Sequence, residues 1–343
     1  MAKVLVAGAG GYIGVPLCKK LLERGHCLIA LDRFFFGKDR IEKLGYSERA
    51  AVLVEDTRDF DPEVLNGVEI VIDLAGLSND ASAEIDPDLT RSINCAGGMR
   101  LARLSQDAGV RRYVYSSSAS VYGHGVRERL TENDDCRPQS LYAESKLRVE
   151  EAVGKLAGPG FETVIFRNST VFGLAARMRF DLAVNIMTLR AWKERVIYVM
   201  GSGEQWRPFV HINDVVQALL LGAEEEEAER VAGEIFNVGS DEMNYQIRHL
   251  AQFVLDVIPH VTVHRIPDDP DKRTYNLSFA KIKQRLGFEP SIRVHEGIVE
   301  IKQALERGDI AGEDPTCYTL QWYRSLLEWE RRIKELTLRD RIL

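Results

Sequence analysis

Short β-rich runs alternate with helix-patterned stretches through the first half of the chain, an order that few folds accommodate. The expected strands are Val4–Ala7, Leu28–Leu31, Val52–Val54, Ile70–Leu74, Tyr113–Tyr115 and Val164–Phe166. Neighbouring parallel strands require a crossover connection, and a helix between two strands supplies one. We therefore expect an α/β fold in which a doubly wound parallel sheet carries helices on both faces.

The pattern loosens after Gly173, which indicates a second, smaller unit. The elements expected here are the helix Phe180–Lys193, the strand Val196–Val199, the helices Asn213–Ala223 and Ile247–Val257, the strand Val261–Arg265, and the helices Phe279–Leu286 and His295–Arg307. A further strand, Ile235–Val238, is expected to extend the first sheet. We predict one domain over residues 1–173, rejoined by 209–240, and a smaller C-terminal α/β substrate-binding domain over 174–208 and 241–343.

The C-terminal extension carries an apolar stripe at helical spacing. Its members are Trp322, Leu326, Trp329, Ile333 and Leu336. Residues three or four apart share one face of a helix, so this stripe must cover another surface. Two interpretations stay open: the helix packs on its own smaller domain, or it contributes to a contact between subunits.

Composition excludes several classes of protein. The 45 basic and 52 acidic residues leave a formal charge of −7, so no nucleic-acid partner is expected. No apolar run approaches the ~20 residues that cross a bilayer, and Met1 leads directly into a strand, so we expect a cytoplasmic protein without a membrane partner. The cysteines are scattered, so we expect no metal site and read all as buried thiols: Cys18, Cys27, Cys95, Cys136 and Cys317.

A glycine-rich turn follows the first strand and opens the first helix. Its sequence is Gly8-Ala9-Gly10-Gly11-Tyr12-Ile13-Gly14. Glycine permits a tight turn and a close backbone approach, and the helix N-terminus offers unpaired N–H groups to a pyrophosphate. Asp32 ends the second strand, where a carboxylate accepts hydrogen bonds from an adenosine ribose. The sequence therefore predicts a Rossmann-type domain that binds NAD, although the adjacent Arg33 would suit the 2′-phosphate of NADP.

Three side chains form a candidate catalytic set. Tyr142 and Lys146 lie four residues apart in an expected helix, so they share one face. A nearby ammonium and a positive nicotinamide ring would stabilise a phenolate, which makes the pair an acid or base. The run Ser116–Gly123 ends the fifth strand, where the carboxyl ends of parallel strands border the ligand crevice. A hydroxyl from this run is expected to bind a substrate oxygen.

These motifs together resemble the extended short-chain dehydrogenase/reductase family, in particular its nucleotide-sugar epimerases of the UDP-glucose 4-epimerase type. The resemblance rests on GAGGYIG, Asp32, Asp56, Leu74-Ala75-Gly76, SSSASVYG and YAESK. It implies that Ser118, Tyr142 and Lys146 are the catalytic Ser, Tyr and Lys. The further cofactor-binding residues that it implies are Gly8, Gly11, Tyr12, Ile13, Gly14, Asp32, Arg33, Asp56, Thr57, Leu74, Ala75, Gly76, Asn94, Ser116 and Asn168.

The same resemblance implies a nucleotide diphosphate sugar as substrate. Its diphosphate would meet Asn185 and Arg207, together with a cation of the Asp271–Arg273 turn, where Lys272 and Arg273 compete and Arg273 is preferred. Ser78, Ser118 and Thr170 would lie along the sugar. Family members that dehydrate sugars carry an Asp–Glu pair after the serine or threonine, and the present chain has Ala119-Ser120 there.

The expected activity is NAD-dependent epimerisation through a transient 4-keto-sugar. The alternative is an NDP-sugar 4-dehydrogenase or 4-ketoreductase, acting for example on an activated heptose or deoxysugar with the same three residues. The resemblance also implies a homodimer formed through helices of the first domain. Arg167, at the end of its expected strand, is interpreted as a structural ion-pair partner.

Overall fold

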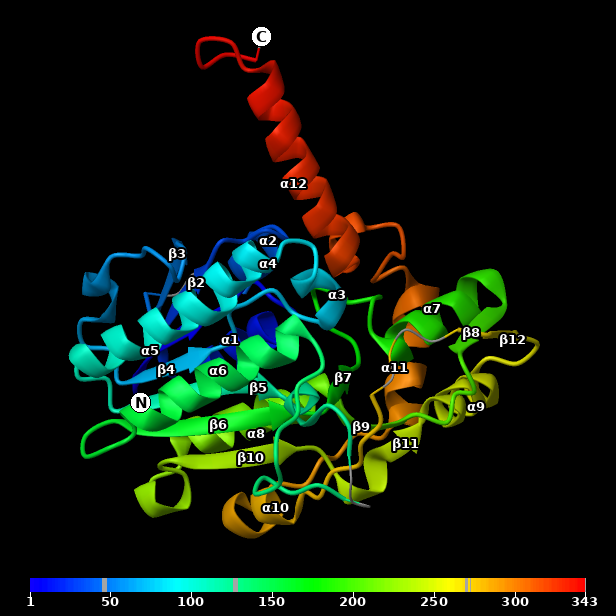
Figure 1. Ribbon diagram of the computed structural model, residues 1–343, viewed down its shortest axis with the longest axis horizontal. Coiled ribbons are helices and arrows are strands. Elements are labelled where there is room, and N and C mark those ends of the chain that lie inside the picture. The colour runs from blue at the N-terminus through cyan, green and yellow to red at the C-terminus, as the bar shows by residue number, and fades with distance from the viewer. Residues whose placement is uncertain (45–47, 126–128, 269–270, 272, 343) are drawn as a thin grey trace.

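The expected alternation of strands and helices is present in the computed structural model, which describes residues 1–44, 48–125, 129–268, 271 and 273–342. The central sheet has seven parallel strands in the order β10-β6-β5-β4-β1-β2-β3 (Figure 1). These strands are β1 (Lys3–Ala7), β2 (Cys27–Asp32), β3 (Ala50–Val54), β4 (Ile70–Asp73), β5 (Arg112–Ser118), β6 (Glu162–Asn168) and β10 (Glu234–Val238). The doubly wound, Rossmann-type sheet predicted from the sequence is therefore confirmed, including the return of residues 234–238 beside β6.

Helices cover both faces of this sheet because its strands are apolar on both sides. On one face, α1 (Gly14–Glu23) and α8 (Ile212–Glu224) pack against Val4 and Val6 of β1. On the other, α5 (Gly98–Asp107) and α6 (Leu141–Leu156) pack against Leu5 and Ala7. The shorter helices of this half are α2 (Asp39–Glu42), α3 (Asp80–Ala83), α4 (Pro87–Thr90), η1 (Pro62–Leu65), η3 (Ala119–Tyr122) and the π-helical η2 (Arg91–Gly97).

The second half of the chain builds a smaller lobe beside the carboxyl ends of the central strands (Figure 1). Its strands are β7 (Thr170–Phe172), β8 (Val196–Met200), β9 (Trp206–His211), β11 (Asn244–Gln246) and β12 (Thr262–Ile266). Its helices are α7 (Ala183–Glu194), α9 (Ile247–Val257), α11 (Val294–Arg307), η5 (Asp241–Met243) and η6 (Pro315–Cys317). From the same half of the chain, η4 (Ala228–Arg230) and α10 (Ala280–Leu286) instead lie beside β10 of the central sheet. Phe172, Phe209 and Leu250 lie in the core of this lobe. The residue boundaries that we predicted between two domains stay predictions.

Two expectations need correction. Sequence reading missed β7, β9 and β11, which form one three-stranded sheet. These strands are short or contain proline and charged residues, so their sequences lack the apolar run or alternation that indicates a strand. The cysteines are not all buried, because Cys27 at the start of β2 is exposed and Cys136 is half-buried.

The C-terminal helix α12 (Thr319–Leu336) contacts the larger domain at its beginning and then leaves the body of the molecule (Figure 1). The indole of Trp322 donates a hydrogen bond to the carbonyl of Phe35, in the loop after β2. Thr319, in the first turn of the same helix, accepts a hydrogen bond from Arg177, which belongs to the predicted smaller domain. The first turns therefore contact both units, and the two interpretations of the stripe stay predictions. Further along, Trp329, Ile333 and Leu336 are exposed. Among the described residues, no helix combines the length and apolar character of a membrane span.

Candidate active site

A cleft of about 1270 Å³ separates the carboxyl edge of the central sheet from the smaller lobe. Pockets for a single small ligand are typically ~300–1,000 Å³, so this cleft has room for a dinucleotide and a second ligand. Of the site residues predicted from the sequence, Asn94 and Asn185 are the two that do not line it. The structure therefore brings together residues that are spread from Gly8 to Arg273.

The glycine turn forms one wall of the cleft for conformational and steric reasons. Gly8 has a φ of +81°, a region that side chains disfavour. A Cβ added to Gly14 would lie 2.2 Å from the carbonyl oxygen of Gly8. Only glycine therefore lets helix α1 begin this close to the turn. The N-terminus of α1 faces the cleft between the turn and Asp32, as a pyrophosphate requires.

The adenosine side of the cleft lies at the ends of β2 and β3. Asp32 accepts hydrogen bonds from the backbone N–H groups of Gly10, at 3.0 Å, and Phe34, while burial raises its pKa. Arg33 pairs with Asp56 at 3.4 Å. Although burial opposes it, hydrogen bonds from Arg58 hold the pKa of Asp56 below its ordinary value. The Arg33 guanidinium is thus already paired with a protein carboxylate. This end of the cleft therefore suits the ribose hydroxyls of NAD better than the 2′-phosphate of NADP.

Asn94 holds the loop after β4 and does not face the cleft. Its Oδ1 accepts a hydrogen bond from Leu77 N (2.7 Å), and its Nδ2 donates to Leu77 O (3.1 Å) and to Ser145 Oγ (3.2 Å). These bonds fix the run Leu74–Ser78, whose residues line the cleft. Asn94 therefore positions the wall of the site, in place of the direct cofactor contact that the resemblance implied.

Asn168 and Ser116 lie where the strands β5 and β6 end side by side. The Asn168 amide donates to Ser116 Oγ at 2.9 Å, while its Oδ1 is buried and has no hydrogen-bond partner among the described residues. An unsatisfied buried acceptor is costly and suits a ligand donor such as a carboxamide N–H. Together with the glycine turn and Asp32, this acceptor shows that the residues present fit a nicotinamide dinucleotide.

The candidate catalytic residues meet at the carboxyl end of β5. Ser118 ends that strand, and Tyr142 and Lys146 lie on consecutive turns of α6, whose N-terminus is capped by Ser140. The Lys146 ammonium donates to the carbonyl of Ser116 at 2.8 Å and lies 6.0 Å from the centre of the Tyr142 ring. Burial lowers the pKa of Lys146, although Asp73 opposes the shift. The predicted trio is thus assembled in one place.

Burial and the carboxylate of Asp80 raise the pKa of Tyr142 to about 12, although Arg179 and Ser118 act in the opposite direction. The phenol is consequently neutral at physiological pH in the ligand-free protein. Bringing a cation beside the ring would favour the phenolate. Tyr142 therefore needs a bound positive group before it can act as a base.

This electrostatic state predicts a result for absorbance titration of the ligand-free protein. The difference spectrum between wild type and Tyr142→Phe should show no phenolate below pH ~10, the ordinary tyrosine pKa. Below its raised pKa the phenol keeps its proton, so the signal appears only as the pH approaches about 12. A phenolate band near neutral pH, lost in Tyr142→Phe, would contradict this assignment.

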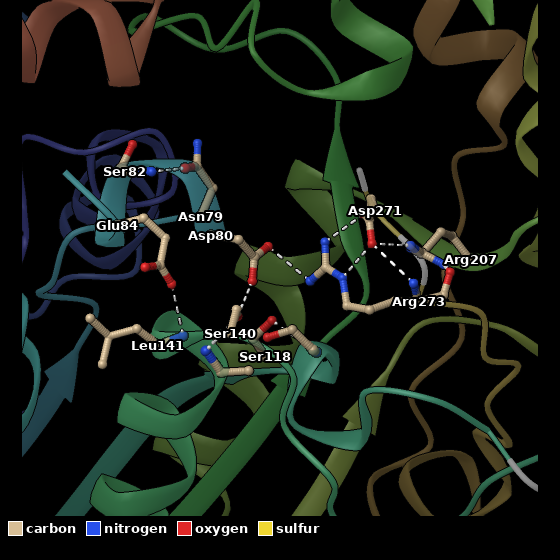
Figure 2. Close-up of polar contacts among 12 residues, drawn as sticks. Asn79, Asp80, Ser82, Glu84, Ser118, Ser140, Leu141, Arg207, Asp271 and Arg273 are labelled. Atoms are coloured by element: carbon tan, nitrogen blue, oxygen red, sulfur yellow. Dashed lines mark hydrogen bonds and ion pairs between the residues drawn. The ribbon is translucent and has the colours of Figure 1, made fainter. Parts of the chain in front are cut away.

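Arg207 and Arg273 are joined through one carboxylate on the lobe side of the cleft (Figure 2). Asp271 pairs with Arg207 at 2.9 Å and with Arg273 at 2.7 Å. Arg273 also pairs with Asp80 at 2.8 Å, and Asp80 accepts a hydrogen bond from Ser140, the cap of the catalytic helix. The two guanidinium groups thus lie together on the cleft wall, each paired with a carboxylate, and the network reaches the N-terminus of the helix that carries Tyr142. Lys272, the other predicted cation, lies outside the described residues.

Asn185 lies behind the wall of the cleft and does not line it. It is fully buried, accepts a hydrogen bond from Gly173 N at 3.1 Å, and donates to the carbonyl of Arg179 and to the Tyr12 hydroxyl. Tyr12 in turn donates to the carbonyl of Gly173 at 2.6 Å. These bonds tie the glycine turn to the smaller lobe, so Asn185 positions the cleft walls and is not free to meet a diphosphate.

Sequence reading missed several cleft residues. The acidic partners Asp80, Asp181 and Asp271, the buried cation Arg179, and Tyr323 of α12 all line the site. Asp271 carried a signal, because an acid two residues before a predicted cationic ligand is a natural partner for it. The other four do not occur in a pattern that indicates a ligand.

Comparison with known proteins agrees with this geometry. A model of the NAD dependent epimerase/dehydratase family matches residues 4–239. The chain is 27% identical to UDP-glucose 4-epimerase of Corynebacterium glutamicum over 319 residues, covering 87% of this chain and 94% of that protein. It is also 27% identical to UDP-glucuronic acid decarboxylase 1 of Arabidopsis thaliana over 307 residues, covering 86% of this chain and 68% of that protein.

A solved structure shares the fold. UDP-glucuronic acid 4-epimerase of Bacillus cereus, in complex with UDP-glucuronic acid and NAD, superposes with a TM-score of 0.80 at 22% identity, over 89% of this chain and 99% of that one. The family model covers more than half of the chain and includes the glycine turn and the candidate catalytic residues. The chain therefore belongs to the NAD-dependent epimerase/dehydratase family, and its cofactor is NAD.

Proposed function

We propose that the protein epimerises a nucleotide diphosphate sugar at C4, through a transient 4-keto-sugar. The observation that carries this proposal is one cleft with a dinucleotide cradle, an adjacent Ser118/Tyr142/Lys146 set, and two neighbouring arginines, Arg207 and Arg273, that share Asp271. A diphosphate that takes the place of Asp271 on these guanidinium groups would let its sugar reach Tyr142. The relatives named for UDP-sugars support uridine diphosphate as the nucleotide.

In this mechanism Tyr142 takes the proton of the sugar C4 hydroxyl, and Ser118 holds the same oxygen by a hydrogen bond. NAD, held by the glycine turn, Asp32 and Asn168, would supply the hydride chemistry at C4 when bound. Lys146 supplies a buried positive charge on the same helix face, which favours the phenolate. Arg207 and Arg273 hold the diphosphate while the keto-sugar turns and presents its other face. Tyr142 then gives the proton back.

The residues after Ser118 favour epimerisation over elimination of water or carbon dioxide. Ala119 and Ser120 offer no carboxyl group for further proton transfer. The neighbouring carboxylates have protein partners: Asp80 binds Arg273, and Glu84 accepts a hydrogen bond from Leu141 N at 3.2 Å (Figure 2). Tyr142 is therefore the proton-transfer group that this proposal assigns to oxidation and reduction at one carbon.

The test is to incubate the purified protein with single UDP-hexoses and no added oxidant or reductant. We expect C4 epimers to interconvert with retention of a deuterium placed at C4, and with no net change in NADH absorbance. Accumulation of a 4-keto-sugar with NADH, or consumption of NADH, would contradict epimerisation and identify a dehydrogenase or ketoreductase. Exchange of the C4 deuterium with solvent would exclude the proposed route. We also propose that the protein is cytoplasmic and forms a homodimer.

A further inference from the structure

The adenosine end of the cleft is completed by an element from the far end of the chain. Leu320 and Tyr323, from the first turns of α12, line the same cleft as Asp32 and Arg33. Figure 1 shows α12 rising from the body of the molecule beside α3, so these first turns are the part of the helix that touches the larger domain. The first turns of α12 therefore place Leu320 and Tyr323 at the adenosine end of the cleft.

The first turns of α12 are anchored on the loop after β2. The Trp322 indole donates to Phe35 O at 2.6 Å. The ring of Tyr323 lies edge-on to Phe35, with centroids 6.2 Å apart, and packs against Phe36 at 5.4 Å. This loop carries the chain away from Asp32, whose carboxylate accepts from Phe34 N. Tyr323 is consequently held next to the acid that we expect to bind the adenosine ribose.

Arg177 fixes the same segment from the other side. Its guanidinium donates to Thr319 Oγ1 at 2.8 Å and to Thr316 O at 3.1 Å, and lies 3.6 Å from the centre of the Phe36 ring. Arg177 is 2% exposed, so these contacts are shielded from water. Hydrogen bonds and cation–π contacts of a buried guanidinium restrict the groups that it contacts, here Thr319 and Phe36. The position of Tyr323 is thus determined by packing and hydrogen bonds from two directions.

The Tyr323 hydroxyl has no hydrogen-bond partner among the described residues. Burial raises the pKa of Tyr323 to about 12, with Asp32 adding to the rise and Arg177 opposing it. The group is therefore a protonated donor at physiological pH. A phenol that lines a cleft without a partner for its O–H suits an acceptor on a ligand.

We propose that Tyr323 is a cofactor-binding residue, donating a hydrogen bond to the adenosine ribose or adjoining phosphate of NAD, and that the first turns of α12 close this end of the cleft and slow cofactor release. The remote end of the chain thereby contributes to holding the cofactor. This inference concerns the cofactor and does not depend on which sugar reaction the protein performs.

The experiment measures NAD release from the full-length protein. Protein loaded with radiolabelled NAD⁺ is chased with excess unlabelled NAD⁺, and retained label is followed with time. Tyr323→Phe should release NAD⁺ about fivefold faster, which corresponds to one neutral hydrogen bond of about 1 kcal/mol. Tyr323→Ala should release it faster still, because the contacts with Phe35 and Phe36 are also lost. If wild-type release is too fast to follow, equilibrium dialysis should give the same ratios in Kd.

Ile333→Ala is the matched control, since Ile333 lies on the same helix and is 49% exposed. It should release NAD⁺ at the wild-type rate. The Tyr323→Phe variant keeps the aromatic packing, so it decides the question even if Tyr323→Ala fails to fold. Wild-type release from Tyr323→Phe, or equal acceleration by Ile333→Ala, would overturn the proposal. No sugar is present, so failure of the proposed epimerase activity would leave this result unaffected.

Discussion

Replacement of Tyr142 by phenylalanine should lower the turnover number by about 10²–10⁴-fold, the range that a positioned acid–base group contributes. The ring would still fill its place on α6, so the fold and the cofactor cradle should persist. What is lost is the one hydroxyl that lies beside Ser118 and transfers the substrate proton. Turnover of a UDP-hexose at saturating substrate, with NAD content measured on the same preparation, checks this expectation.

Tyr245→Phe is the matched control for that experiment. Tyr245 is a half-buried tyrosine of β11 whose ring packs against Phe209 and Phe253 and does not itself line the cleft. Its variant should keep wild-type turnover. Near-normal turnover of Tyr142→Phe would remove the assignment of Tyr142 as acid and base. A loss of NAD together with turnover would instead show that the tyrosine mainly supports cofactor binding.

The second large effect should come from breaking a buried ion pair beneath Ser118, the candidate catalytic serine. Arg167 of β6 and Glu150 of α6 pair at 2.7 Å, with 5% and 3% of their side chains exposed. Ser117, next to Ser118, donates a hydrogen bond to the same carboxylate. Removing Glu150 would leave a buried guanidinium without its counter-charge. Glu150→Ala should therefore lower the free energy of unfolding by about 3–5 kcal/mol, measured by urea denaturation.

A double replacement separates this pair from simple loss of packing. Glu150→Leu combined with Arg167→Met removes both charges, and it should cost clearly less than the sum of the two single changes. The control is Glu335→Ala, which breaks the exposed Arg331–Glu335 pair on α12 and should leave unfolding unchanged. Additive single effects would contradict the ion-pair explanation. The interpretation of Arg167 as a structural partner, made from its sequence position, is confirmed by this geometry.

Features that depend on the residue pattern within one helix, strand or turn could be predicted from the sequence. The parallel sheet follows from the alternation of strands and helices, and the cofactor cradle follows from glycines inside a single turn. Tyr142 and Lys146 share a helix face through their spacing alone. Each of these features depends on residues within a few turns of one another, so periodicity and backbone preference are sufficient to predict them.

Sequence reading failed where the role of a side chain depends on a distant partner. The resemblance implied that Asn94 and Asn185 contact ligands, yet their amides bind Leu77, Gly173 and Tyr12. An amide satisfies whichever backbone groups packing brings to it, and no local pattern records which groups those are. Their assignment as ligand contacts therefore could not be corrected without the tertiary structure.

The amino-acid sequence by itself predicted the alternation of strands and helices, the glycine turn and the shared helix face of Tyr142 and Lys146, because each depends on the pattern of neighbouring residues. The catalytic roles of Ser118, Tyr142 and Lys146 were implied by the resemblance to the family. Only the tertiary structure decided that Asp271 joins Arg207 to Arg273, that Asp80 links this pair to the cap of the catalytic helix, and that α12 reaches the cofactor cleft. Each of these contacts joins segments that lie far apart in the chain or belong to different lobes. Their partners are selected by packing of the whole molecule, which no single segment encodes.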